Sequence, residues 1–352
     1  MGIDNTVDRG YTISRQIRTQ RFAEYSEVEK MAKYIVGIDL GGMSAKGALF
    51  SINGELLGCK KVKTNKADGF EGTAQLLADL ANSLAAEAGV DFSNVAAVGI
   101  GAPGVVDSSA GVVLRWSNFA WDNAPLAAKM QTLTGKPTYI ANDANAAALG
   151  EATFGATAQY QSSILLTIGT GVGGGMVFDG KLIEGYKSAG AELGHITIRE
   201  GGLECACGRR GCYEKYASAT ALIRQTRHAM VENLQSSMWE IVGGRIEKVD
   251  GRTAFAAAKQ GDETAKRVIE QFVDYLSEGI ADFVNILRPE AIVLGGGIAN
   301  EGEALFEPLR KAVDKRTYIA MDIVPLKIVG AKLGNQAGVY GAYCIAKSHI
   351  NE

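Results

Sequence analysis

One pattern occurs twice along this chain, and it restricts the folds that the chain can adopt. Residues 35–50 form an apolar stretch, a glycine turn and a second apolar stretch, and residues 164–183 repeat this order. Short apolar stretches that are rich in Val and Ile and bounded by glycine are typical of buried strands. Asn53-Gly54 is a strong hairpin signal that leads from the first copy into a third strand. We interpret the two copies as an internal duplication, with one copy in each of two domains.

The segments around the two copies predict an α/β fold. Helical and strand patterns alternate after the three strands, which gives duplicated β-β-β-α-β-α units and a mixed sheet. The 352 residues suit two domains, since a domain usually has ~100–200 residues. We expect a smaller lobe of residues 34–150 plus 335–352, a larger lobe of 151–334 with the metal site described below, and an N-terminal extension of 1–33. The expected helices are 69–88, 124–134, 144–154, 263–287 and 336–348, and the further strands are 95–100, 138–141 and 291–294.

The overall charge is nearly balanced, with 36 Lys and Arg against 39 Asp and Glu and a formal net charge of −3. This balance does not predict a nucleic-acid surface, and no apolar run approaches the ~20 residues of a membrane helix. The first 33 residues lack the apolar segment of a signal peptide. We therefore expect a cytoplasmic protein without a nucleic-acid or membrane partner.

The sharpest local signal is a cluster of soft metal ligands. Four of them fall in the pattern H-x9-C-x-C-x4-C: His195, Cys205, Cys207 and Cys212. One nitrogen and three sulfur ligands suit a closed, structural zinc site. A disulfide is the alternative, but a reducing compartment opposes it, and Cys205 and Cys207 are too close in sequence for a good local pair. The remaining Cys59 and Cys344 are expected to be buried thiols.

Three glycine-rich turns follow apolar strands, and their backbone N–H groups are candidates for binding phosphate. The second turn, 169–175, matches G-x-G-x-x-G, as does 99–104, but both lead into extended chain and not into a helix. This disfavours a nicotinamide-dependent oxidoreductase. In the first turn a carboxylate at a strand end suits hydrated Mg²⁺, although a plain tight hairpin also fits. The residues of interest are Asp39, Gly41, Gly42, Ser44 and Lys46 in the first turn, Thr170 and Gly171 in the second, and Gly295, Gly296 and Gly297 in the third.

Acidic side chains stand at two further places. Asn142-Asp143 lies between an apolar strand and an Ala-rich helix. Either side chain suits a helix N-cap, and a carboxylate at a strand end also suits a general base. Glu192 and Glu214 flank the cysteine cluster, which would fix both carboxylates for bidentate binding of vicinal hydroxyls. Solvated surface glutamates are the alternative.

Together these motifs resemble the ROK family (repressors, ORFs and sugar kinases), and within it the bacterial glucokinases. The most specific part is the Cys-x-Cys-Gly-x-x-Gly-Cys-x-Glu string with its upstream Glu-x-Gly-His. The resemblance implies an actin-like (ribonuclease H-like) fold of two domains with a cleft between them. It covers about 34–345 and rests on residues 39–46, 101–104, 142–145, 169–175, 190–195, 205–214 and 294–298.

The resemblance also implies ATP-dependent phosphorylation of a hexose at its 6-hydroxyl, with glucose as the first expectation. It implies that Asp143 is the general base, that Asp39 serves Mg²⁺ and that the glycine turns listed above hold the triphosphate. It further implies a homodimer or homotetramer. The sugar contacts that it implies are Gly104, Asn118, Asn142, Asp143, Glu192, His195 and Glu214.

One departure and several alternatives remain. The family usually has Thr where this chain has Met43, so Ser44 is the hydroxyl nearest to that position. N-acetylmannosamine, allose or fructose can replace glucose in this prediction, and polyphosphate can replace ATP. A sugar-responsive repressor is disfavoured, because a helix-turn-helix module needs on the order of 45 residues and the first 33 show no basic excess. A sugar sensor without catalysis is the third alternative.

Overall fold

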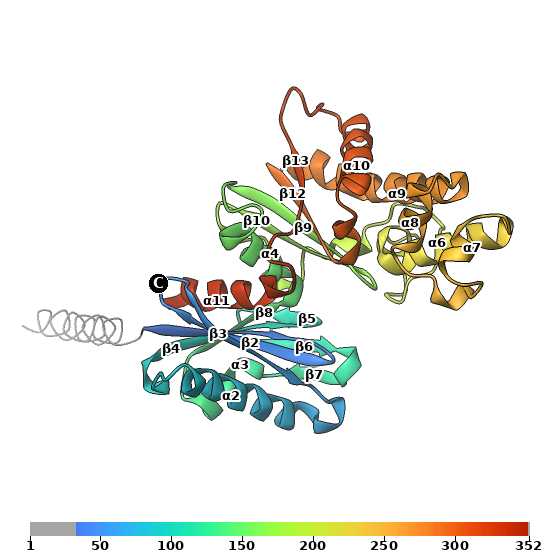
Figure 1. Ribbon diagram of the computed structural model, residues 1–352. Coiled ribbons are helices and arrows are strands. Elements are labelled where there is room, and N and C mark those ends of the chain that lie inside the picture. The colour runs from blue at the N-terminus through green and yellow to red at the C-terminus, as the bar shows by residue number, and fades with distance from the viewer. Residues whose placement is uncertain (1–32, 351–352) are drawn as a thin grey trace, which may run out of the picture.

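The protein is built on two five-stranded sheets with the same strand order (Figure 1). The computed structural model describes residues 33–350, so the predicted extension, apart from Lys33, lies outside the described residues. The first sheet has the order β3-β2-β1-β4-β8, with bounds β1 Tyr34–Leu40, β2 Ser44–Ser51, β3 Leu56–Lys63, β4 Val95–Ala102 and β8 Thr138–Asn142. The second has the order β11-β10-β9-β12-β13, with bounds β9 Ser162–Ile168, β10 Val172–Phe178, β11 Lys181–Leu182, β12 Ala291–Gly295 and β13 Lys327–Gly330.

The strand directions confirm the predicted duplication. In each sheet the first three strands of the unit pair antiparallel, and the two later strands join parallel to the first strand. Helices connect the parallel strands, as such pairs require. The helices are α2 Gly69–Glu87, α3 Leu126–Thr134, α4 Asp143–Phe154, α5 Glu214–Ala217, α6 Ala219–Glu232, α7 Met238–Ile241, α8 Thr253–Lys259, α9 Glu263–Leu287, α10 Glu303–Arg316 and α11 Ala337–Ile350.

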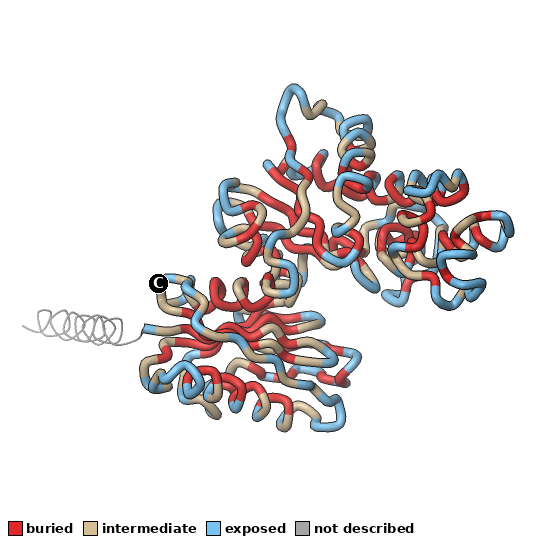
Figure 2. Tube along the Cα trace, in the orientation of Figure 1, coloured by how far each residue is buried: buried red, intermediate tan, exposed pale blue. Residues whose placement is uncertain are grey.

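Each sheet is covered on both faces, which explains why its central strands are apolar throughout. In β9, Ile164 and Leu166 face the large core under α9, while Leu165 faces α4. The predicted leucine stripe of α2 packs on the first sheet, and α11 covers the opposite face of β1 and β4. Buried chain is therefore concentrated in the two sheets and the helix surfaces that face them (Figure 2). We call the part built on the first sheet the first lobe and the part built on the second sheet the second lobe.

Helices α4 and α11 lie between the two sheets and cross at glycines (Figure 1). A Cβ atom added to Gly150 of α4 would lie 2.4 Å from the carbonyl oxygen of Ala337, and one added to Gly341 of α11 would lie 1.6 Å from that of Ala146. Only glycine allows backbones to approach so closely. The contact between the lobes is therefore a tight helix crossing.

Two details differ from the sequence analysis. A small third sheet follows β4, formed by β5 Val105–Asp107, β6 Val112–Trp116 and β7 Trp121–Ala124. Its strands are too short for periodicity to reveal them. The predicted glycine turn at 169–175 was wrong in extent, because β10 already begins at Val172 and contains three glycines. These glycines make room for neighbouring residues; for example, an added Cβ at Gly175 would lie 2.6 Å from that of Ala148.

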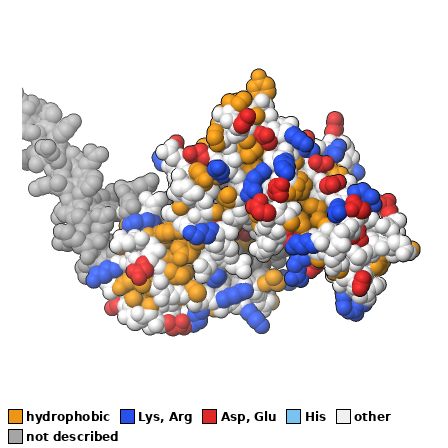
Figure 3. Space-filling model, turned by 45° about the horizontal axis from the view of Figure 1, so that its top comes forward, with side chains coloured by type: hydrophobic (Ala, Val, Ile, Leu, Met, Phe, Trp, Pro, Cys, Tyr) orange, Lys and Arg blue, Asp and Glu red, His pale blue; other side chains and the backbone are white. Residues whose placement is uncertain are grey.

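Surface features agree with the balanced composition. On the face shown in Figure 3, acidic and basic side chains are interspersed. Among residues 33–350, none of the helices combines the length and the apolar character needed to span a bilayer. Cys344 is buried as expected, but Cys59 is exposed, because it lies on the outermost strand of the first sheet.

Candidate active site

Two adjoining cavities lie between the lobes, and one carboxylate lines both. The larger has a volume of about 840 Å³. Its lining comes from both lobes and includes Asp39 of β1, Gly297 after β12 and Asn335 in the loop before α11. The smaller has a volume of about 90 Å³ and is lined by residues that include Gly104, Asn142, Asn145 and Glu192. Asp143 lines both cavities. The Asp143 carboxylate therefore lies between a group held in the smaller cavity and the larger cavity.

The position of Asp143 follows from the way in which α4 begins. The side chain of Asn142 caps the helix, since its Oδ1 accepts hydrogen bonds from the N–H groups of Ala144 (2.9 Å) and Asn145 (3.2 Å). Its Nδ2 donates to the carbonyl oxygen of Gly104 at 3.0 Å. Of the two proposed caps, Asn142 therefore fills this role in full, and it ties the start of α4 to the loop that lines the smaller cavity.

The environment of Asp143 makes its carboxylate more basic than usual. Its pKa is raised to about 6, chiefly by burial; the hydrogen bond from the N–H of Ala144 opposes this rise, and the charges of Asp39 and Glu192 contribute to it. A carboxylate with a pKa near neutrality suits a general base, because it is ionised at pH 7 and still binds a proton well. Its Oδ1 accepts the Ala144 N–H at 2.8 Å.

The larger cavity contains the strand-end carboxylate and two of the glycine turns. Asp39 is the penultimate residue of β1 and lies opposite Lys46 of β2. Burial raises the pKa of Asp39, and the Lys46 ammonium partly counters this effect. Lys46 also donates a hydrogen bond to the carbonyl oxygen of Asn335 at 3.1 Å. The glycine-turn residues that line this cavity are Thr170, Gly171, Gly295, Gly296 and Gly297.

Not every expected residue lies in a cavity. Gly41, Gly42 and Ser44 form the turn between β1 and β2 but line neither cavity. Met43 is 87% exposed at the same turn. Asn118 is exposed in a short 3₁₀ turn beside Gly42, where an added Cβ atom would lie 3.9 Å from its amide nitrogen. The two residues are thus neighbours, away from the described cavities.

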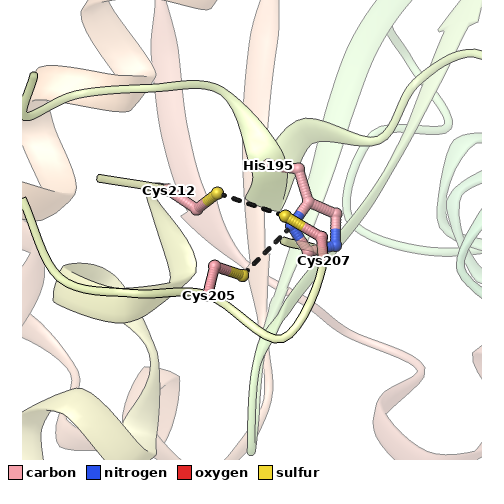
Figure 4. A group of neighbouring side chains, drawn as sticks. All are labelled: His195, Cys205, Cys207 and Cys212. Carbon is pink, nitrogen blue, oxygen red and sulfur yellow. Dashed lines mark hydrogen bonds between the residues drawn. The ribbon is translucent and has the colours of Figure 1, made fainter. Parts of the chain in front are cut away.

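The four predicted metal ligands lie together (Figure 4). Their ligand atoms all fall within 4.8 Å of one another, with Cys205 Sγ 3.7 Å from His195 Nδ1 and Cys207 Sγ 3.6 Å from Cys212 Sγ. Ligands at ~2.0–2.3 Å from one tetrahedral zinc would lie about 3.5–3.8 Å apart. The donor set and its spacing therefore fit zinc.

Glycines and one arginine fold the loop that carries this cluster. Gly208 and Gly211 adopt φ of 87° and 81°, and a Cβ added to Gly211 would lie 1.7 Å from the carbonyl oxygen of Arg199. Arg209 donates to the carbonyl oxygen of His195 at 2.9 Å and to Thr197 Oγ1 at 2.7 Å. These bonds hold the histidine segment against the cysteine loop.

Glu214 links the metal cluster to the larger cavity. Its Oε1 lies 3.2 Å from Cys205 Sγ, and an added Cβ at Gly171 would lie 2.5 Å from its Oε2. The side chain thus lies between the cluster and the second glycine turn, and it lines the larger cavity, whereas Glu192 lines the smaller one. The two glutamates that flank the cluster in sequence therefore face different cavities.

The structure adds residues that the sequence analysis did not select. Asn145 is 3% exposed and lines the smaller cavity. Its Nδ2 lies 3.4 Å from Glu184 Oε1. Glu184 also accepts a hydrogen bond from Ser108 Oγ at 3.0 Å, across the lobes. Glu151 and Asn335 line the larger cavity. Asn145 stands in the 142–145 motif, but no pattern in the sequence points to Glu151 or Glu184.

Comparison with known proteins agrees with this arrangement. A model of the ROK family matches residues 35–349. The glucokinase of Thermotoga maritima is 39% identical, over 90% of this chain and 98% of its own length. The crystal structure of a ROK family glucokinase from Streptomyces griseus in complex with glucose and AMPPNP superposes with a TM-score of 0.74 at 33% identity, covering 90% of this chain and 99% of that one. The xylose repressor of Caldicellulosiruptor bescii is 31% identical over 97% of this chain and 86% of its own length.

Proposed function

The chain belongs to the ROK family, and from this premise we propose that it is a sugar kinase that transfers the terminal phosphate of ATP to the 6-hydroxyl of glucose. Glucokinases among its relatives, which it matches over nearly their whole length, support this activity. The observation that carries the proposal is the place of Asp143 at the junction of two cavities. We assign the sugar to the smaller cavity and the nucleotide to the larger one.

In this proposal Asp143 accepts the proton of the attacking hydroxyl. Phosphoryl transfer depends mainly on positioning and charge neutralisation, and a general base contributes typically ~10²–10⁴ in rate. Glu192 and Asn142 line the smaller cavity beside Asp143 and are suited to hold sugar hydroxyls. Closure of the lobes would exclude water, which otherwise competes with the sugar for ATP.

The larger cavity supplies the groups that a nucleotide needs. Backbone N–H groups of the turns at 169–171 and 295–297 are suited to meet phosphate oxygens. Lys46 pairs with Asp39 in the register of β1 and β2 and donates a hydrogen bond to the carbonyl oxygen of Asn335, which lines the cavity. Asp39 and Asp143 both line this cavity, and the charge of Asp39 raises the pKa of Asp143, so the two carboxylates fit a hard cation such as Mg²⁺. When bound, Mg²⁺ neutralises phosphate charge.

The metal cluster has a structural role in this proposal. Zinc held by His195 and the three cysteines would fix Glu214 beside the second glycine turn, because this carboxylate lies next to Cys205. It would also fix the segment that runs back from His195 to Glu192. The cluster thus positions the walls of both cavities without taking part in the chemistry.

A coupled assay of ADP release tests the proposed activity. We expect glucose to give the highest kcat/KM in a panel with N-acetylmannosamine, allose and fructose, and ATP to be a better donor than polyphosphate. The control sugar is 6-deoxyglucose, which lacks the acceptor hydroxyl and should bind without turnover. Absence of ADP release with every hexose would refute the kinase, and turnover of 6-deoxyglucose would refute the 6-hydroxyl as acceptor.

A repressor is the second candidate, and one observation favours it. The match to the Caldicellulosiruptor xylose repressor spans 97% of this chain, against 90% for the Thermotoga glucokinase, and so reaches further outside the matched family domain. A DNA mobility-shift assay distinguishes the two functions. A repressor must bind DNA with an affinity that falls steeply with salt, whereas the kinase that we propose shows no such shift.

A further inference from the structure

The chain passes between the two sheets twice, and one buried side chain contacts both passages. The first passage leaves β8, runs through α4 and the loop 155–161, and enters β9. The second leaves β13, runs through the loop 331–336 and enters α11. Glu151 lies on the last turn of α4 and is 1% exposed. Any change in the angle between the lobes has to bend the chain at these passages.

The carboxylate of Glu151 is held by backbone donors from both loops. Its Oε2 accepts hydrogen bonds from the N–H groups of Ala156 at 2.8 Å and Lys332 at 3.1 Å. Its Oε1 accepts one from the N–H of Leu333 at 2.7 Å. Ala156 belongs to the first passage. Lys332 and Leu333 belong to the second, and they follow Glu151 in sequence by 181 and 182 residues.

This arrangement is unusual for a buried acid. Burying a carboxylate is costly unless it is paired or fully hydrogen-bonded, and none of the ion pairs of residues 33–350 includes Glu151. The neighbouring Gly155 is adapted to it, since an added Cβ there would lie 2.0 Å from Glu151 Oε2. The three backbone donors therefore replace a cation, and they come from two segments that a shorter or apolar side chain would leave unconnected.

Glu151 is also connected to both sides of the larger cavity. It lies two turns along α4 from Asp143, and it lines that cavity together with Asn335 of the second loop. Lys46 of the first lobe donates to the carbonyl oxygen of Asn335 at 3.1 Å. The second loop thus joins Glu151 on α4 to the strand that faces Asp39, so its position sets how the two walls of the cavity face each other.

We propose that Glu151 is a positioning residue that clamps the two interlobe passages to each other and so fixes the angle at which the lobes close over the nucleotide. This inference rests on the proposed kinase function. The tight crossing of α4 and α11 at Gly150 and Gly341 supplies the contact about which the lobes turn. The clamp keeps that turn aligned, because α4 and the loop before α11 move together.

The primary variant is Glu151→Gln, which keeps the length of the side chain but presents an N–H donor to a backbone N–H donor. We expect amide exchange to become faster at 155–157 and 331–336, with little change in β9. We expect kcat to fall by about 10- to 100-fold, since misplacement of reacting groups by ~1 Å costs this much. The dissociation constant for glucose alone, measured by calorimetry, should change by less than about threefold, because the smaller cavity is closed by other contacts.

Glu290→Gln is the matched control. Glu290 also accepts hydrogen bonds from backbone N–H groups of a distant segment, those of Gln161 at 2.6 Å and Ser162 at 3.0 Å, but both donors stand where the first passage enters β9, so Glu290 does not join the two passages to each other. We expect this variant to retain the wild-type kcat. Leu333→Pro serves if Glu151→Gln does not fold, because it removes a donor of the clamp and leaves Glu151 in place. Leu333 has φ −78°, which proline adopts.

Closure is measured separately by small-angle scattering, with and without glucose and a non-hydrolysable ATP analogue. Wild type should contract on adding both ligands, and Glu151→Gln or Leu333→Pro should contract less. These scattering and exchange measurements need no turnover. An inactive wild-type protein would therefore refute the proposed kinase activity, while the scattering and exchange data would still test the clamp. Unchanged exchange at both loops, wild-type kcat despite faster exchange, or equal contraction in all variants would overturn the clamp.

Discussion

The substitution Asp143→Asn is expected to make the protein more stable and nearly inactive. The pKa of this carboxyl is raised from 3.8 to about 6, chiefly by burial and then by the charges of Asp39 and Glu192. The ionised form is therefore disfavoured in the folded protein, although the proposed reaction needs it. Asparagine keeps the shape of the side chain and an oxygen that can accept the N–H of Ala144, but it carries no charge.

The sign of the effect follows from proton linkage. Because the pKa of the folded state lies above that of the unfolded state, the folded protein binds the additional proton between about pH 4 and about pH 6. Stability therefore falls as the pH rises through this interval and stays lower above it. At about 1.4 kcal/mol per pKa unit, the raised pKa sets an upper bound of about 3 kcal/mol. We expect a gain of about 1–3 kcal/mol for Asp143→Asn above pH 6.

Urea unfolding at about pH 8 and about pH 4.5, without added Mg²⁺ or nucleotide, measures this difference. The gain should reach its full size at the higher pH and be about a third as large at the lower one, where the folded carboxyl is protonated while the unfolded one, with a pKa of 3.8, is still mostly ionised. Asp122→Asn is the control, because it makes the same chemical change at an exposed position. Equal stability of Asp143→Asn and wild type at pH 8, or a gain that does not depend on pH, would refute the reasoning. Turnover near the wild-type rate would separately remove Asp143 as the base.

Three further outcomes follow from the same structure. The value of kcat/KM for glucose should fall about tenfold per pH unit below about pH 6, because protonated Asp143 cannot accept a proton; a flat profile from about pH 5 to 8 would contradict this. Verified removal of zinc should weaken glucose binding by about tenfold or more and nucleotide binding less, because the cluster holds the segment from His195 back to Glu192, which lines the smaller cavity, whereas the larger cavity keeps its backbone turns at 169–171 and 295–297; calorimetry with each ligand decides. Gly341→Ala should cost about 1–3 kcal/mol in urea, since its Cβ would lie 1.6 Å from a backbone oxygen, whereas Gly58→Ala, with nothing within 4 Å, should cost less.

Much of the fold could be predicted from the sequence because its two sheets are built from long, regular patterns. The helix expected at 263–287 lies at Glu263–Leu287, and the strand expected at 291–294 lies at Ala291–Gly295. Elements shorter than about five residues, such as β5, carry too few positions to show a period. The glycines of β10 were interpreted as a turn, because close packing against α4 and a tight turn call for the same residue.

The site was predictable where several unusual residues stand close together in sequence. The metal cluster lies within one loop and so leaves a local pattern. Glu214 also belongs to that pattern, but its position beside the second glycine turn depends on how the loop folds back. Glu151 and Glu184 are single acids whose partners come from distant segments. Residues of this kind leave no local signal, because only the fold brings their partners to them.

The two acids of α4 show how one helix serves both stability and chemistry. Glu151 is buried and is held by three backbone N–H groups, so its charge is balanced and its position fixed. Asp143 accepts one local N–H and stands near two further acids, so its charge is poorly balanced. The helix joins these sites rigidly, and a displacement at the passages between the lobes must move the proposed base as well. The environment of Asp143 raises the pKa of its carboxyl to about 6. The hydrogen bonds of Glu151 keep the helix, and with it Asp143, in position.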